Sequence, residues 1–129
     1  MIKKIESDDN NIIENYINDE YYKCIYLYLD YKKYGFKNDN VNIWIQTNDL
    51  DITAIILRYY TGMHIYSRKN DCNIEEIKEL VLTQNPTMIC AEQSIIEELY
   101  SVMDKEKYNM EKGWVRELAE SNNYSTDNV

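Results

Sequence analysis

Apolar and polar residues alternate along Val41–Gln46, which is the pattern of an extended strand. Apolar side chains at every second position from Val41 to Ile45 are predicted to face a core, while Trp44 and Gln46 fall on the opposite side. The first strand is therefore predicted to be half-buried. A turn is expected at Asn48-Asp49-Leu50-Asp51, because Asn and Asp side chains bond to their own backbone and tolerate tight turns.

Two more strands are predicted after this turn. Ile52–Tyr60 is almost continuously apolar or aromatic and rich in β-branched residues, so both of its faces are expected to be covered. Thr61-Gly62 interrupts the run, and Met63–Tyr66 predicts a third, shorter strand beside the second. The elements predicted before and after these three strands are expected to pack against them.

The residues before them predict an edge strand and a short helix. Met1–Glu6 alternates weakly and could form a first edge strand. Ser7-Asp8-Asp9 offers N-cap candidates, and apolar residues then recur at helical spacing, which predicts an amphipathic helix over about Asp9–Ile17.

Apolar residues are so frequent in Glu20–Tyr34 that neither a helical nor a strand spacing can be recognised. Its length, its closing Lys32-Lys33 and the following Gly35 favour a helix. A strand at Cys24–Leu29 is the alternative.

Helices and strands are predicted to alternate after Ser67. Asn73 is a candidate cap for a helix that ends at Asn85-Pro86, and Thr87–Cys90 predicts a short buried strand, so a βαβ-like unit is expected. Another amphipathic helix is expected to start at Glu92 or Ser94 and to run to about Lys105.

The carboxy-terminal residues predict the end of one domain. Tyr108–Leu118 could form a last strand with Gly113 as a bulge or turn. Residues 119–129 have no apolar period and are predicted to be a polar linker or disordered tail after a domain spanning residues 1–118.

The amino-acid composition argues against several kinds of partner and site. The chain has 129 residues, 14 Lys and Arg against 23 Asp and Glu, and a net charge of −9, which argues against nucleic acid or an anionic membrane as a partner. It has no apolar run of about 18 residues and no signal-peptide pattern, so a cytoplasmic location is expected. The three scattered cysteines fit a reducing compartment better than a disulfide framework and are not spaced as a metal site.

Few residues suggest catalysis. His64 is the only histidine, and a partly exposed strand position is favoured over a general base. Cys72 is the least unfavourable nucleophile of Cys24, Cys72 and Cys90, because it lies near basic residues and before a predicted helix, but incidental thiols are favoured for all three. Glu75-Glu76 and Glu97-Glu98 are explained by solvation on helix faces. No catalytic, cofactor-binding or metal-binding residue is therefore predicted.

The chain resembles the amino-terminal half of two-part bacterial GNAT-type N-acetyltransferases. The resemblance covers most of residues 1–118. It rests on Tyr34-Gly35, Val41-Asn42-Ile43-Trp44, Ile55–Tyr60, Met63–Ser67, a Glu-rich helix, a short strand near Ile89 and a long helix before Gly113-Trp114-Val115.

The resemblance implies a GNAT-like α/β fold, with a mixed, mainly antiparallel sheet and helices on both faces. In that family the acetyl-CoA pyrophosphate lies on a loop that reads Gln or Arg, two variable residues, Gly, one variable residue, then Gly or Ala. The segment expected to hold it, between Met88 and Ile96, contains no glycine.

This half is therefore expected to be non-catalytic and to bind no cofactor. Acetyl-CoA would bind to a carboxy-terminal catalytic half, which would be its partner. The alternatives are a stand-alone ligand-binding module or one that forms a homodimer, through a sheet edge or a tyrosine-rich surface.

Overall fold

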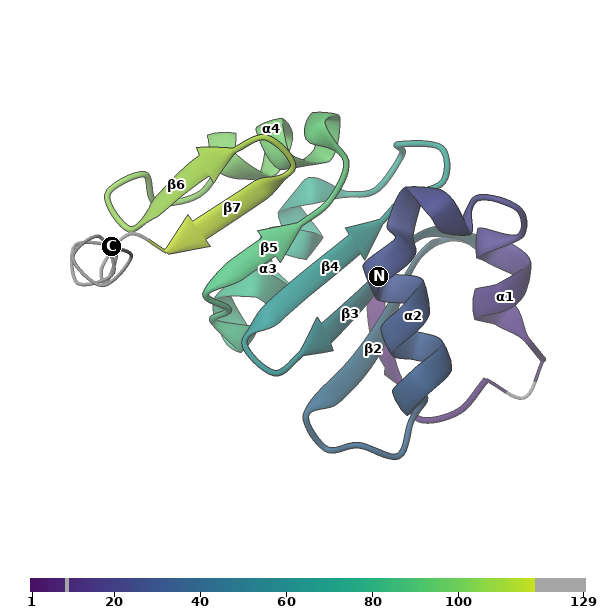
Figure 1. The fold of residues 1–129 in the computed structure, drawn as a ribbon. Coiled ribbons are helices and arrows are strands. Elements are labelled where there is room, and N and C mark those ends of the chain that lie inside the picture. Colours follow the sequence, from purple (N-terminus) through teal and green to yellow (C-terminus); the bar gives the residue numbers. More distant parts are fainter. Residues whose placement is uncertain (9, 118–129) are drawn as a thin grey trace.

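The computed structural model describes residues 1–8 and 10–117, which form a seven-stranded sheet with helices on both faces (Figure 1). The strand order is β1-β2-β3-β4-β5-β7-β6. Neighbouring strands are antiparallel except β4 and β5, which run parallel. The predicted mixed, mainly antiparallel α/β fold is confirmed. The predicted domain end at residue 118 and the tail at 119–129 lie outside the described residues.

The sheet is built from short outer strands and longer central ones. The strands are β1 (Ile2–Ile5), β2 (Val41–Asn48), β3 (Asp51–Tyr59), β4 (Gly62–Tyr66), β5 (Met88–Cys90), β6 (Tyr108–Glu111) and β7 (Trp114–Glu117). The helices are α1 (Ile12–Ile17), the 3-10 helix η1 (Tyr21–Cys24), α2 (Ile25–Tyr34), α3 (Ile74–Gln84) and α4 (Gln93–Ser101). The predicted edge strand and the three predicted central strands are all present.

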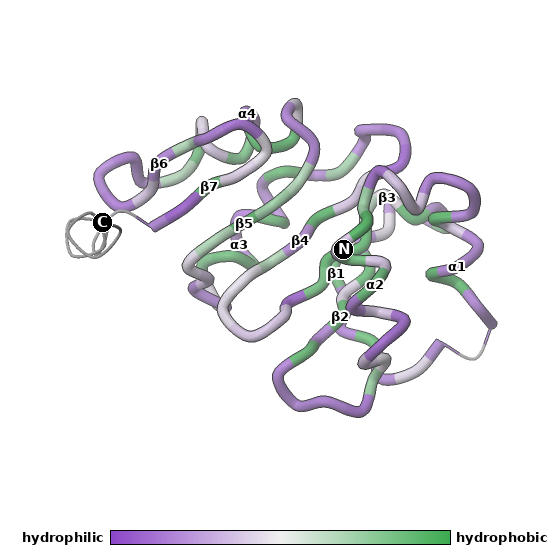
Figure 2. The backbone as a smooth tube through the Cα atoms, viewed as in Figure 1, coloured by the Kyte–Doolittle hydropathy of each residue, from purple (hydrophilic) through white to green (hydrophobic). Residues whose placement is uncertain are grey.

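Each face of the sheet has its own hydrophobic core. Helices α1 and α2 pack on the β2–β4 part of one face, whereas α3 and α4 pack on the other face (Figure 1). Hydrophobic residues accordingly follow the central strands, and the surrounding turns are mostly hydrophilic (Figure 2). Trp44 belongs to the α3–α4 core while Ile43 belongs to the α1–α2 core. The prediction that the first central strand is half-buried is therefore wrong, because both of its faces are covered.

Several predicted helices have different limits in the structure. The helical prediction for Glu20–Tyr34 is confirmed as η1 followed by α2, and the alternative strand at Cys24–Leu29 is wrong. Helix α1 begins at Ile12 because the Asp8 carboxylate accepts hydrogen bonds from the amides of Ile12 and Ile13. Helix α4 ends at Ser101 rather than near Lys105. None of the described helices is long and apolar enough to cross a membrane.

The carboxy-terminal part of the sheet differs from the single predicted strand. Tyr108–Leu118 contains two antiparallel strands, β6 and β7, joined at Gly113, whose φ of 77° requires a residue that tolerates the left-handed region. The turn interpretation of Gly113 is thus confirmed and the single strand is wrong. The expected βαβ-like unit is present, because α3 connects the parallel strands β4 and β5.

Candidate functional site

Strand β5 pairs with only part of β4. Gly62–His64 pairs with Met88–Cys90, and β4 continues for two residues beyond this pairing, to Tyr66. After Cys90 the chain passes through Ala91-Glu92 into α4. Two clefts open around the last paired residue of β4.

The larger cleft, of about 600 Å³, lies beside the β3–β4 turn and the start of β5. Its lining is Tyr59, Tyr60, Thr61, Gly62, His64, Thr87, Met88, Arg116 and Glu117. The smaller, of about 220 Å³, lies between the η1–α2 segment and the ends of β4 and β5. Its lining is Tyr22–Leu27, His64, Ile65, Cys90, Ala91 and Glu92. His64 contributes to both clefts, so it marks the place where they meet.

The His64 side chain lies on the α2 face of the sheet. The neighbouring β4 residues Met63 and Ile65 point into the α3–α4 core, as the predicted alternation requires. The Tyr26 ring of α2 has its centroid 6.3 Å from that of His64. Burial lowers the pKa of His64 below its ordinary value of 6.5, so the imidazole is neutral at pH 7 and can accept a proton.

Within the described residues, no side chain forms a hydrogen bond with the His64 imidazole. No hydrogen bond from the described residues therefore selects one tautomer of the imidazole. The prediction of a partly exposed strand residue is confirmed. The predicted absence of a catalytic role stays a prediction.

The cysteines are not activated as nucleophiles. Cys24 and Cys90 line the smaller cleft, and Cys72 packs against the α3–α4 core. Burial, followed by the charges of Glu20 and Glu92, raises the pKa of Cys24 to about 12. Burial also raises the pKa of Cys72 and of Cys90. Burial thus favours the protonated thiol at all three positions, and the incidental role predicted for them stays a prediction.

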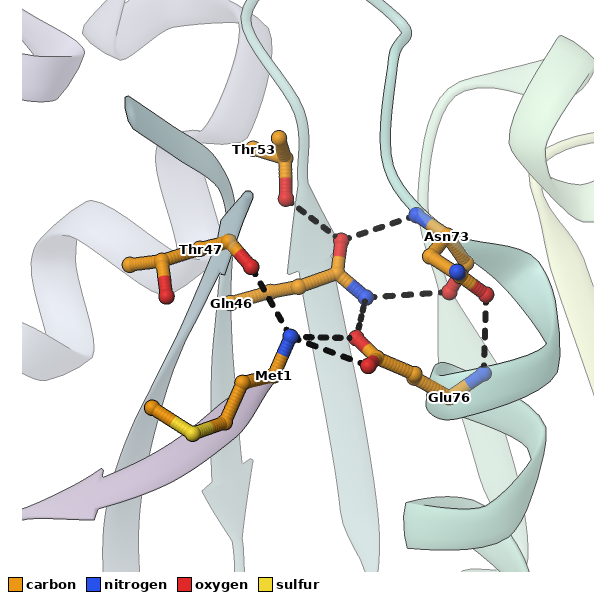
Figure 3. Close-up of polar contacts among 6 residues, drawn as sticks. All are labelled: Met1, Gln46, Thr47, Thr53, Asn73 and Glu76. Atoms are coloured by element: carbon orange, nitrogen blue, oxygen red, sulfur yellow. Dashed lines mark hydrogen bonds and ion pairs between the residues drawn. The ribbon is translucent and has the colours of Figure 1, made fainter. Parts of the chain in front are cut away.

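The start of α3 follows the parallel strand β4. Two of its backbone amides, those of Asn73 and Glu76, are bonded within the protein. The amide of Asn73 donates to Gln46 Oε1 at 2.8 Å, and the amide of Glu76 donates to Asn73 Oδ1 at 3.1 Å (Figure 3). In the preceding loop, the amide of Asp71 donates to Ser67 Oγ at 3.2 Å. These amides are the kind of donor that binds phosphate at a helix start.

Gln46 connects this helix start to the sheet. Its buried side chain accepts a hydrogen bond from Thr53 Oγ1 at 2.7 Å and donates to Glu76 Oε1 at 3.0 Å. The Glu76 carboxylate also binds the amino group of Met1 at 3.0 Å (Figure 3). The burial of Gln46 corrects its assignment to the polar side of a half-buried strand.

The loop before this helix differs from the acetyl-CoA motif. Counted from Arg68, it has Asp71 where the motif has Gly and Asn73 where the motif has Gly or Ala. The amides of Asp71, Asn73 and Glu76 already have acceptors within the protein. The acidic residues Asp71, Glu75 and Glu76 would also oppose an anion there. The predicted absence of a cofactor-binding site in this chain stays a prediction.

The segment between Met88 and Ile96, where the motif was expected, is the other junction from a parallel strand to a helix. It comprises β5, a two-residue connection and the first turn of α4, whose N-cap position is Glu92. It has no glycine, and its capping residue is acidic. Neither junction at the ends of the parallel strands thus has the composition of a phosphate loop.

Comparison with protein-family models gives no match, and comparison with curated proteins gives none. Among solved structures, a candidate acetyltransferase from Exiguobacterium sp. 255-15 is similar, with a TM-score of 0.51 and 9% sequence identity. The alignment covers 100% of this chain and 98% of that chain. The fold is acetyltransferase-like. At this identity the similarity concerns the fold alone, and it does not extend to a two-part arrangement.

The acetyltransferase-like fold brings together some of the candidate residues and separates others. His64, Cys24 and Cys90 meet at the smaller cleft, whereas Cys72 lies on the other face. The pair Glu75-Glu76 lies at the start of α3, and Glu97 accepts a hydrogen bond from Gln93 on α4. Sequence patterns did not predict the cleft residues Tyr26, Met88 and Arg116, because their proximity to His64 depends on how α2, β5 and β7 pack beside β4.

Proposed function

We propose that this chain is an acetyltransferase-like domain of the GNAT type that does not bind acetyl-CoA by itself and does not transfer acetyl groups alone. The start of α3 carries this proposal. The amides of Asn73 and Glu76 are bonded to Gln46 and Asn73, the amide of Asp71 in the preceding loop is bonded to Ser67, and the first turn is acidic. A cofactor anchored by its pyrophosphate would have to break these bonds and would meet negative charge.

In this proposal acetyl transfer belongs to a carboxy-terminal half of a longer protein, as the sequence resemblance implies. The domain described here would pack against that half and shape its acceptor groove. The two clefts that meet at His64 support such a role, because they are open and lined by aromatic side chains.

A stand-alone ligand-binding module is the second candidate. It is favoured by one observation, namely that His64 joins the two clefts without an acid or base partner among the described residues. Such a site can bind a ligand but lacks the arrangement for proton transfer.

Titration of acetyl-CoA into the full 129-residue chain by calorimetry tests the first proposal. No heat is expected at millimolar ligand, and an acetyltransferase with an intact glycine loop serves as the positive control. Saturable one-to-one binding would overturn the proposal. NMR tests the second candidate through the resonances of His64, the only histidine of the chain. A small molecule that shifts these resonances, in a chain that does not bind acetyl-CoA, would identify a ligand-binding module.

A further inference from the structure

An exposed hydrophobic stripe runs along η1 and α2. The inner side of this segment packs into the α1–α2 core through Cys24, Leu27 and Tyr31 among others. Its outer side carries large hydrophobic residues with 38% to 64% of each side chain exposed, namely Tyr21, Tyr22, Ile25, Tyr26 and Leu29. We call these five residues the α2 stripe. They are half of the ten large hydrophobic side chains that are exposed in the described part of the chain.

We propose that the α2 stripe is a self-association surface, on which a second copy of this chain packs its own α2 in the antiparallel direction. A two-fold axis places the same surface on both subunits, so a single hydrophobic stripe on one helix is sufficient. Solvated helices normally present a polar outer face, whereas the outer side of η1 and α2 carries five large hydrophobic residues before the exposed Lys32 and Lys33.

The exposed area is large enough for a small dimer interface. An aromatic side chain has about 150–250 Å² of surface, so half-exposed members of the stripe offer about 100 Å² each. The stripe then contributes about 500 Å² per subunit and about 1,000 Å² in total, which is the lower limit for a specific interface. We therefore expect a weak, concentration-dependent dimer.

Charge favours the antiparallel orientation. Lys33 lies at the carboxyl end of α2 and forms no ion pair within residues 1–8 and 10–117. Asp19 lies just before η1 and is 79% exposed, although it contacts Arg68. Antiparallel pairing centred near Tyr26 places Lys33 of each subunit close to Asp19 of the other. Parallel pairing would instead place the two Lys33 ammonium groups together.

The proposed dimer would also cover the smaller cleft. Tyr22, Ile25 and Tyr26 belong to the stripe and also line that cleft beside His64. Self-association would therefore restrict access to His64. Because further burial disfavours the charged imidazole, the pKa of His64 should fall when the protein is concentrated.

Light scattering and sedimentation of the full chain, from about 1 μM to about 500 μM, test the proposal. The wild type should change from monomer to dimer, and Leu29→Lys should raise the dissociation constant at least about tenfold, because it places a charge in an apolar interface. Leu82→Lys is the matched control, since Leu82 is 62% exposed on α3, outside the stripe. A monomeric wild type over the whole range, or equal weakening by both substitutions, would overturn the proposal.

Two charge variants test the orientation without altering the stripe. Lys33→Glu should weaken the dimer by placing like charges together, and Asp19→Lys in the same chain should restore it. Restoration supports the antiparallel pair, whereas no restoration contradicts it. Both measurements are independent of acetyl-CoA binding, so they can fail or succeed without affecting the proposed function.

Discussion

The start of α3 and the two clefts beside His64 differ in how their polar groups are bonded. At α3 the backbone amides, the Gln46 side chain and the Glu76 carboxylate bond to one another. At the clefts, by contrast, the His64 side chain has no hydrogen-bonding side chain among the described residues. One sheet thus carries a helix start whose polar groups bond to one another and two clefts that stay open beside His64.

The largest of the predicted effects should come from Gln46→Ala, in the hydrogen-bond network at the start of α3. The substitution leaves the Asn73 amide and the Thr53 hydroxyl without their partner, and each unsatisfied buried group costs about 1–3 kcal/mol. We expect a loss of about 3 kcal/mol in the free energy of unfolding, measured by urea denaturation. Gln84→Ala is the control, because Gln84 bonds only to its neighbour Thr83 in the described structure. Equal losses for the two variants would mean that the network does not stabilise the fold.

Asn73→Ala should have a smaller effect on the same region. It removes the side-chain cap that accepts the Glu76 amide, which typically costs about 1 kcal/mol. Thermal unfolding of the variant measures this loss. Asn73→Asp should recover most of the stability, because aspartate is also a good N-cap. If Asn73→Asp were as unstable as the alanine variant, the cap would not be the cause.

The smallest of the predicted effects should come from substitution of His64, which lies beside the two clefts. Its pKa is lowered by burial, so the folded state binds fewer protons than the unfolded state below pH 6.5. The stabilisation is complete above pH 6.5 and is lost as the pH falls towards the folded-state pKa. His64→Gln should remove this part of the pH dependence, which unfolding curves between about pH 5 and pH 8 would detect. Identical pH profiles for the two proteins would contradict a buried, neutral imidazole.

Local sequence patterns correctly predicted the structural features that depend on residues close together in the chain. The strands β2, β3 and β4, the Asn73 cap and the direction of His64 all follow from residue periodicity and capping chemistry. Gly35 also ends α2 as predicted, with a φ of 58°.

The features that sequence patterns did not predict depend on packing between residues far apart in the chain. Gln46 was assigned to a polar face, but α3 covers that face and buries it. The clefts depend on residues far apart in the chain, such as Tyr26, His64 and Met88, and no period connects them. The division of Tyr108–Leu118 into two strands required the left-handed conformation of Gly113, for which the sequence left both a bulge and a turn open.

The order in which the sheet is connected has a consequence for folding. Strands β2, β3 and β4 are joined by two-residue turns, so their pairings close very short loops and should form early. Strand β1 pairs with β2 across the whole α1–α2 segment, with Ile5 opposite Ile43, so it should join late. Until β1 arrives, β2 presents a free and largely apolar edge to other chains. Refolding at high protein concentration should therefore produce aggregates through this edge.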